Sequence, residues 1–153
     1  MHKYSHLQLQ MGVFLEWRQS LDSTQYNIPV IAKFGKEVAP NRLESTLRAF
    51  FIMCKELRTR IDLDDKRESC QWIAPDMVIP IVRKKLTEDF AKIYINNVFI
   101  KPYNLLSEEP PCKTEIMETP EHVYWLWVFQ HIFIDGTAND PIFFQIDMER
   151  SAT

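Results

Sequence analysis

The sequence predicts an α/β fold (α+β in the stricter sense), with a mixed sheet flanked by helices. Segments with the apolar spacing of helices alternate along the chain with short runs rich in β-branched and aromatic residues, which are typical of strands. No internal repeat or low-complexity linker interrupts this alternation. A chain of 153 residues with 46% hydrophobic side chains can bury one core, so we expect residues 1–153 to form a single domain.

Four segments have the periodicity of helices. The first covers residues 7–19, behind a capping box formed by Ser5 and Gln8. The second begins at Pro40, because proline is favoured in the first turn of a helix. Its inner face is predicted to carry Leu43, Leu47, Phe50, Phe51, Cys54 and Leu57. The remaining helices are expected at residues 87–97 and 140–149.

Strands are predicted at residues 26–34, 58–63, 70–74, 113–119 and 122–130. The second and third should form a hairpin across a charged turn, and the last two should pair across Pro120 and Glu121. Pro80 makes residues 77–82 an edge or extended segment, because proline cannot donate to a sheet ladder. Residues 123–129 are all apolar or aromatic, which is typical of a strand covered on both faces. Trp125 and Trp127 are expected in the core, on opposite sides of this strand.

Composition excludes several classes of function. The net charge is −3, and the lysines and arginines are spread along the chain, so the sequence gives no sign of a basic surface that would bind nucleic acid. No apolar run reaches the roughly 18 residues of a membrane span, and the first 15 residues are too polar for a signal peptide. Three cysteines without CxxC spacing and four histidines without ligand pairs predict a reduced, metal-free, cytoplasmic protein. Only three glycines occur, which excludes the glycine-rich phosphate loops.

A histidine, an acid and a glycine follow the most apolar strand. They are His131, Asp135 and Gly136. Burial of the preceding strand should hold His131 in place, and Gly136 permits the sharp turn that starts the next element. We therefore interpret His131 as facing a substrate and Asp135 as facing the protein interior. A histidine satisfied within the core is the simpler alternative for His131.

Several short motifs occur in a recognisable order along the chain. A Ser-x-x-Gln helix start at residues 5–8 leads to Tyr-Asn-Ile-Pro at residues 26–29. An RHExLRTxF-like segment covers residues 53–61, and a PFDL-like segment covers residues 102–105. An HHxxxDG-like segment covers residues 130–136. In these motifs the chain resembles the amino-terminal lobe of the condensation domains of nonribosomal peptide synthetases, which are relatives of chloramphenicol acetyltransferase.

The resemblance implies one lobe of a two-lobed fold and an acyltransferase reaction. In that family the amine of a carrier-tethered aminoacyl acceptor attacks the thioester of a carrier-tethered donor, and an amide bond forms. No cofactor is expected to bind directly, because phosphopantetheine is carried by the partner carrier domains. The implied partners are peptidyl carrier protein domains and a carboxy-terminal condensation lobe, with neither nucleic acid nor membrane. The apolar face left by a missing second lobe should favour self-association.

The resemblance also assigns roles to single residues. His131 matches the functional histidine, as a general base or as a group that positions the amine and stabilises the tetrahedral intermediate. Gln130 stands where the family has its first histidine, and Met53 where it has an arginine. Asp135 matches an acid that pairs with an arginine behind the site, and Arg58 is the motif arginine that remains. Gln130, Asp135, Gly136 and Arg58 are therefore expected to support the site structurally.

Three functions remain open from the sequence. The first is a condensation-domain lobe that is inactive without its second lobe. The second is a degenerate condensation-like module that docks a carrier or tailoring protein without catalysis, which the replacements Gln130 and Met53 would permit. The third is a small self-assembling acetyltransferase, which is disfavoured because that family places HxxxDG near the end of a longer chain.

Overall fold

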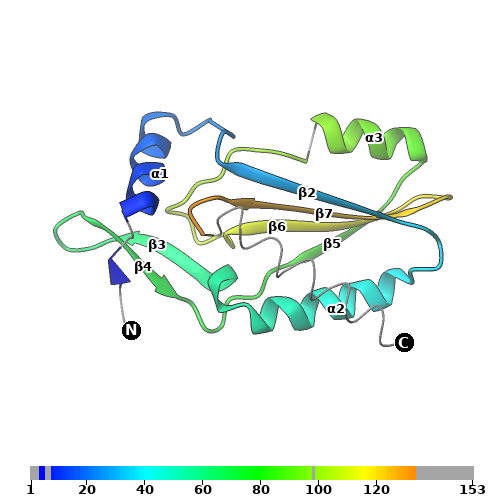
Figure 1. Cartoon of the computed structure of the whole chain (residues 1–153), viewed down its shortest axis with the longest axis horizontal. Coiled ribbons are helices and arrows are strands. Elements are labelled where there is room, and N and C mark those ends of the chain that lie inside the picture. The colour runs from blue at the N-terminus through cyan, green and yellow to red at the C-terminus, as the bar shows by residue number, and fades with distance from the viewer. Residues whose placement is uncertain (1–3, 6–7, 98, 134–153) are drawn as a thin grey trace.

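The computed structural model describes residues 4–5, 8–97 and 99–133 (Figure 1). Helices and strands alternate, and the strands form two sheets with the orders β1-β4-β3 and β2-β7-β6-β5. The helices are α1 (Gln8–Gln19), α2 (Pro40–Met53), the 3₁₀ helix η1 (Lys55–Arg58) and α3 (Glu88–Asn97). The strands are β1 (Tyr4–Ser5), β2 (Asn27–Phe34), β3 (Thr59–Leu63), β4 (Ser69–Ile73), β5 (Ile81–Lys85), β6 (Cys112–Glu118) and β7 (Val123–Gln130).

β7 lies in the middle of the four-stranded sheet. It pairs antiparallel with β2 and β6, whereas β5 pairs parallel with β6. This sheet is therefore mixed, which confirms the predicted fold class. Apolar side chains of α2 pack on one face of β7, and the apolar side of α3 packs on the other, on opposite sides of the sheet in Figure 1. All eight residues of β7 are buried, as the continuous apolar run predicted.

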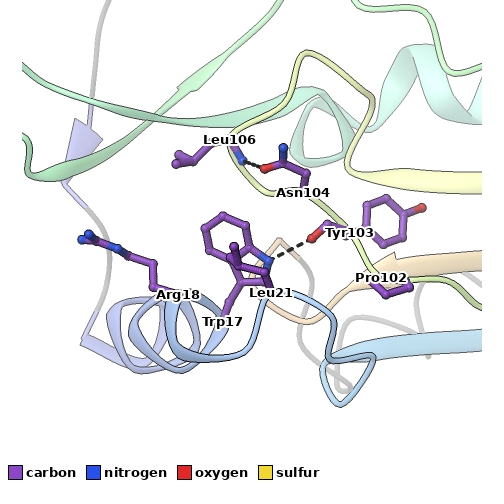
Figure 2. A pocket seen from close by; sticks show the side chains of 7 residues that line it. All are labelled: Trp17, Arg18, Leu21, Pro102, Tyr103, Asn104 and Leu106. Atoms are coloured by element: carbon purple, nitrogen blue, oxygen red, sulfur yellow. Dashed lines mark hydrogen bonds between the residues drawn. The ribbon is translucent and has the colours of Figure 1, made fainter.

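The smaller sheet and α1 form a second packing unit beside the end of β7. Strands β3 and β4 form the predicted hairpin, whose turn is held by the Asp64 carboxylate accepting the main-chain N–H groups of Lys66 and Glu68 at 2.9 and 2.8 Å. Phe14 and Trp17 of α1 pack in a cluster that includes residues of β3 and of the segment after β7. The Trp17 indole also donates a hydrogen bond to the Tyr103 carbonyl at 2.9 Å (Figure 2).

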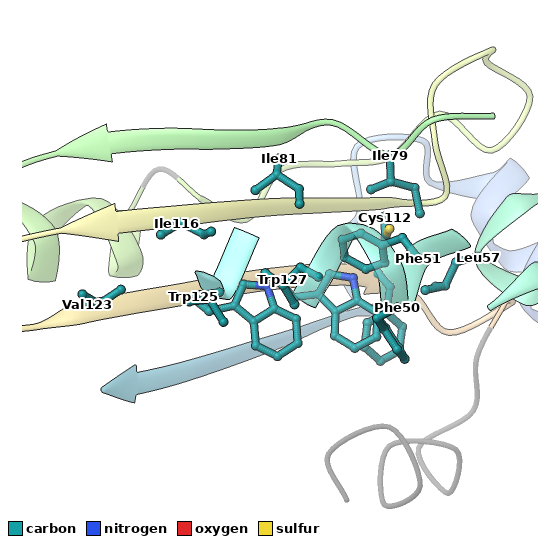
Figure 3. Close-up of a cluster of buried hydrophobic side chains, with 13 residues drawn as sticks. Phe50, Phe51, Leu57, Ile79, Ile81, Cys112, Ile116, Val123, Trp125 and Trp127 are labelled. Carbon is teal, nitrogen blue, oxygen red and sulfur yellow. The ribbon is translucent and has the colours of Figure 1, made fainter. Parts of the chain in front are cut away.

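The two tryptophans of β7 lie on the same face of the strand, so the prediction of opposite sides is wrong. Their rings stack with centroids 5.6 Å apart and planes 13° from parallel (Figure 3). Side chains two positions apart in a strand point to the same face. Both rings belong to the core under α2, where Phe50 meets Trp127 edge-on at 6.3 Å. Their placement in the core was predicted correctly.

Boundaries differ from the predictions where local geometry changes. α2 ends at Met53 because Cys54 adopts an extended conformation, so Leu57 reaches the core from η1 instead of the helix. β5 begins directly after Pro80 and forms an edge of the sheet, as expected for a proline-containing segment. The helix predicted at residues 140–149 lies outside the described residues. None of the helices described is long and apolar enough to cross a membrane.

A buried carboxylate is held between β5, β6 and α3. The Glu115 side chain is only 2% exposed and lies 2.6 Å from the Lys84 ammonium and 3.3 Å from that of Lys113. The Tyr94 hydroxyl donates to the same carboxylate at 3.0 Å. Burial lowers the pKa of Lys84, but its hydrogen bonds to Glu115 and Tyr94 outweigh this effect and raise the pKa above its usual value. The group therefore ties the edge strand and α3 to the centre of the sheet.

Removing one cation from this group should destabilise the fold. Losing one partner of a fully buried ion pair costs about 3–5 kcal/mol, but Lys84 is 29% exposed and Lys113 remains, so we expect Lys84→Met to cost about 1–3 kcal/mol. Because its pKa is raised, this contribution is present below the ordinary lysine value and is lost as pH rises through the folded-state pKa. Urea denaturation at neutral pH measures the loss. Lys92→Met, in an exposed pair with Asp89, is the control, and equal losses in both variants would contradict the assignment.

Candidate functional site

His131 follows β7 directly, and its main chain is fixed by β2. Its N–H donates a hydrogen bond to the Tyr26 carbonyl at 2.9 Å, which extends the β2–β7 pairing by one residue. The Phe133 N–H then bonds the Gln130 carbonyl at 3.1 Å and turns the chain away from the sheet. The His131 side chain is half-buried. The backbone of this histidine is therefore held while part of its side chain stays accessible.

The residues after His131 are anchored on α1. Ile132 is 2% exposed and packs in the cluster that contains Phe14 and Trp17. The Gln10 side-chain amide donates to the Ile132 carbonyl at 3.0 Å. Helix α1 thus fixes the direction in which the chain leaves the sheet beyond His131.

Gln130 occupies a buried polar position at the end of β7. Its side chain is 2% exposed and donates from Nε2 to the Asn27 Oδ1 atom at 2.6 Å. Asn27, its partner in the strand register, donates in turn to the Lys101 carbonyl at 2.7 Å. A side-chain amide can serve at this position because it donates a hydrogen bond without carrying a charge. Gln130 therefore links two of the predicted motifs, residues 26–29 and 130–136.

Arg58 lies at the end of η1, next to Leu57. Leu57 packs in the same core cluster as Phe129, so η1 is seated close to the end of β7. The Arg58 Nη1 group donates to the Pro75 carbonyl at 2.9 Å, and its buried Nε has no partner among the described residues. Asp135 and Gly136 lie outside the described residues, so the pairing of Asp135 with Arg58 stays a prediction.

The PFDL-like segment at residues 102–105 closes one side of a pocket against α1. Besides the bond from Trp17, its Tyr103 hydroxyl donates to the Val128 carbonyl at 3.3 Å. Burial raises the pKa of Tyr103, which keeps this hydroxyl protonated as a donor. The pocket has a volume of about 540 Å³ and is lined by Trp17, Arg18, Leu21, Pro102, Tyr103, Asn104 and Leu106 (Figure 2). The sequence identified this segment only as a motif. It did not predict that Trp17 would bond the Tyr103 carbonyl and line a pocket with this segment.

A second pocket shares Trp17 with the first. It has a volume of about 480 Å³ and is lined by Glu16, Trp17, Gln19, Ser20, Ser23, Gln25, Tyr26 and Gln130. The Tyr26 hydroxyl donates to the Glu16 carboxylate, and this hydrogen bond is the main reason why the pKa of Tyr26 is raised. Because Tyr26 also accepts the main-chain bond of His131, the wall of this pocket is joined directly to the histidine.

The sequence profile described as "Condensation domain" matches residues 1–145. The chain belongs to the condensation domain family. A search of curated proteins finds no match. The match covers all of the motifs, including the histidine segment at the end of β7.

Solved structures share the fold of this condensation-domain chain. The starter condensation domain of rhizomide synthetase RzmA superposes with a TM-score of 0.82 at 21% identity, over 93% of this chain and 35% of that one. A variant of that domain in complex with C8-CoA and Leu-SNAC gives a TM-score of 0.74 at 20% identity, over 85% and 31%. A four-domain nonribosomal peptide synthetase bound to AMP and glycine superposes with a TM-score of 0.72 at 17% sequence identity. That match covers 88% of this chain and 10% of the synthetase. The chain therefore spans about a third of the length of the rhizomide synthetase domain.

A titratable cluster that sequence reasoning missed lies at the other end of β7 of this condensation-domain chain. The Glu88 carboxylate, at the start of α3, accepts a hydrogen bond from the Tyr124 hydroxyl and lies 3.1 Å from the His122 Nδ1 atom. Hydrogen bonds from Thr119 and Tyr124, together with the charge of His122, lower the pKa of Glu88 from 4.5 to about 2. No local signal could reveal this cluster, because 34 residues separate Glu88 from His122.

Three ligand atoms of Glu88, Glu121 and His122 lie within 4.8 Å of one another, a spacing that could hold a metal ion. Two of these residues are already hydrogen bonded to each other, and the Lys36 ammonium bonds the neighbouring Thr119 carbonyl at 2.9 Å. The Glu88 carboxylate also accepts a hydrogen bond from the Tyr124 hydroxyl, so protein donors already engage it. We therefore interpret the cluster as a latch between α3 and the β6–β7 turn.

The Glu88 latch should make the stability of the fold depend on pH in the acidic range. A carboxyl whose folded-state pKa is depressed stabilises the fold above its unfolded pKa of 4.5 and loses that contribution as pH falls toward 2. We expect Glu88→Gln to lower the melting temperature at pH 6 and to flatten its decline between pH 4.5 and 2. Thermal melts followed by circular dichroism across this range test the prediction. Asp89→Asn, whose side chain is 92% exposed, should keep the wild-type profile, and a Glu88→Gln profile parallel to wild type would refute the latch.

Proposed function

We propose that this chain is the amino-terminal lobe of a condensation domain that forms amide bonds in nonribosomal peptide biosynthesis. The observation that carries the proposal is the family match over residues 1–145. The matched residues include the half-buried His131, which follows β7 directly. The reaction joins a carrier-tethered aminoacyl or peptidyl thioester donor to a carrier-tethered aminoacyl acceptor. His131 is the catalytic residue in this proposal, and Gln130, Asp135, Gly136 and Arg58 support the site.

The chemistry fits an imidazole at this position. An α-ammonium group has a pKa near 8, so the attacking nitrogen must lose a proton before or during attack. An imidazole, with an ordinary pKa of about 6.5, can accept that proton or can hold the amine and stabilise the tetrahedral intermediate. Collapse of that intermediate breaks the carbon–sulfur bond and releases the donor carrier's thiol. The protein binds no cofactor in this scheme, since the phosphopantetheine belongs to the carriers.

The partners we propose are peptidyl carrier domains and a carboxy-terminal condensation lobe. The chain covers 35% of the rhizomide synthetase domain, so one lobe alone lacks most of the matched length. We expect one lobe on its own to be inactive, because the two-lobed fold implied by the resemblance needs both lobes to complete the site. Exposed apolar side chains such as Ile52 and Val78, at 72% and 73% exposure, favour contact with another lobe or a second copy.

Gln130 favours a second candidate, a condensation-like module that docks a carrier or tailoring protein without catalysis. The side chain that replaces the family's first histidine cannot be protonated near neutral pH. Its buried bond to Asn27 is a structural role that survives the loss of imidazole. Under this second candidate the completed protein would bind carriers yet form no peptide bond.

The first test is a histidine substitution in the intact two-lobed protein. His131→Ala should reduce peptide-bond formation by about 10²–10⁴-fold, the range ascribed to a general base, and leave the melting temperature nearly unchanged. Product formation from loaded carriers, followed by mass spectrometry, is the measurement. His122→Ala is the matched control, since it removes a histidine of the Glu88 latch and should retain turnover. Full turnover in His131→Ala would favour the docking module.

The second test concerns the proposed pair of Arg58 and Asp135. Removing the carboxylate of a buried ion pair leaves the arginine unpaired, which costs up to about 3–5 kcal/mol. Asp135→Ala should therefore lower the free energy of unfolding. A double-mutant cycle with Arg58→Met, measured by urea denaturation, isolates the pair. Additive losses from the two substitutions would show that the residues do not interact.

A further inference from the structure

We propose that Gln10 of α1 and Gln71 of β4 are positioning residues for His131, because together they hold the main chain that follows the histidine. The inference deepens the proposed function and rests on it for one consequence, the rate of peptide-bond formation. The orientation of His131 itself can be measured without any reaction.

The peptide group between Ile132 and Phe133 is held through both of its polar atoms. Its N–H belongs to Phe133 and donates to the Gln130 carbonyl at 3.1 Å. Its carbonyl belongs to Ile132 and accepts a hydrogen bond from Gln10 Nε2 at 3.0 Å. The His131 N–H is bonded to the end of the neighbouring segment, at 2.9 Å. Of these three bonds, the one from Gln10 comes from a side chain, so a substitution can remove it and leave the other two in place.

Gln71 fixes the orientation of the Gln10 amide. The Ile132 carbonyl can only accept, so the Gln10 atom that reaches it must be Nε2. The Oε1 atom of the same amide accepts from Gln71 Nε2 at 3.2 Å, and Gln10 Nε2 lies 3.4 Å from Gln71 Oε1. The two amides therefore form a reciprocal pair. Rotating the Gln10 amide by half a turn would bring its oxygen against the Ile132 carbonyl, so the pair favours the orientation that donates.

Apolar contacts hold α1 and β4 beside each other around this amide pair. Gln71 is directly opposite Ile61 in the β3–β4 register, so both side chains lie on the same face of the small sheet. Ile61 packs in one cluster with Phe14 of α1 and with Ile132. This face of the sheet therefore supplies an apolar side chain to the cluster of Ile132 and, through Gln71 and Gln10, a hydrogen bond to its carbonyl.

Loss of the Gln10 bond should turn His131 without unfolding the chain. The His131 N–H keeps its main-chain bond and Ile132 stays buried, so the segment keeps its place. The peptide group after Ile132 gains freedom to rotate, and the short chain between passes this rotation to the histidine. A displacement of about 1 Å in a catalytic group can lower a rate by about 10²-fold. A smaller rotation is therefore enough to be seen in turnover.

Matched variants separate a lost donor from a general disturbance of α1. Gln10→Met keeps an unbranched side chain of similar length and removes the donor to the Ile132 carbonyl. Gln10→Arg is the reversal variant, since a guanidinium carries several N–H donors for the same carbonyl. Gln71→Met keeps the donor but removes the partner that orients it. Asn97→Met in α3 is the control, because it removes an exposed amide that donates to the Ile93 carbonyl at 3.1 Å.

The first measurement is NMR of the 153-residue chain with ¹³C-labelled histidine rings, in which His131→Ala identifies the His131 signals. Gln10→Met should shift these signals and the amide signal of Phe133, and Gln71→Met should shift them in the same direction by less. Gln10→Arg and Asn97→Met should leave them close to wild type. Circular dichroism verifies the fold of each variant.

Unchanged His131 signals in Gln10→Met, or an equal shift in Gln10→Arg, would overturn the proposal. If Gln10→Met does not fold, Gln71→Met is the deciding variant, and unchanged His131 signals there have the same meaning.

The second measurement is steady-state peptide-bond formation by the intact two-lobed protein. Gln10→Met should lower kcat about tenfold and change KM by less than about twofold, because a turned histidine affects the reaction step more than binding. Gln10→Arg should restore kcat. A merely structural role would lower the amount of folded protein and leave kcat per folded molecule unchanged, and that result would overturn the assignment.

The two measurements separate this inference from the proposed function. A wild-type protein that forms no peptide bond would remove the proposed function, while the His131 signals would still decide whether Gln10 orients the ring. Wild-type His131 signals in Gln10→Met, in a protein that forms peptide bonds, would remove the positioning role and keep the reaction.

Discussion

The structure depends on the burial of β7 from both sides. Every residue of this strand is at most 5% exposed, and two neighbouring strands and two helices are needed to cover it. Continuous burial fixes the register, since a slip of one residue would exchange the side chains that face α2 with those that face α3. The register in turn sets Asn27 opposite Gln130 and brings the Tyr26 carbonyl to His131. The position of the candidate catalytic histidine is thus a consequence of core packing.

The sequence predicts what local patterns determine. Strands and helices appear close to their expected residues, and the β3–β4 and β6–β7 pairs form because their partners adjoin in the chain. The order of the four-stranded sheet was not predicted, because the parallel pairing of β5 with β6 joins segments separated by α3. The end of α2 was missed because the apolar spacing continues through Leu57, although Cys54 has already left the helix. Periodicity cannot detect a change of backbone conformation that preserves the spacing of buried residues.

For the candidate site, the motifs located residues but not their partners. Gln130 and Asn27 belong to motifs 103 residues apart, and only the strand register shows that they bond to each other. Trp17 and Tyr103 are joined in the same way across 86 residues. The first bond links two motifs, and the second links helix α1 to the PFDL-like motif. These contacts hold α1, β2 and the PFDL-like segment around the end of β7.

The glutamine at position 130 changes the electrostatics of this corner. A histidine in such a buried place could be protonated, and a cation without a carboxylate partner is costly to bury. Glutamine keeps a donor for Asn27 at every pH and never carries a charge. Its second polar atom is then an acceptor of fixed direction, whereas the second nitrogen of an imidazole can be either donor or acceptor. Within residues 130–133, His131 is the only titratable side chain, so it is the residue of this short segment to which the proposed proton transfer is assigned.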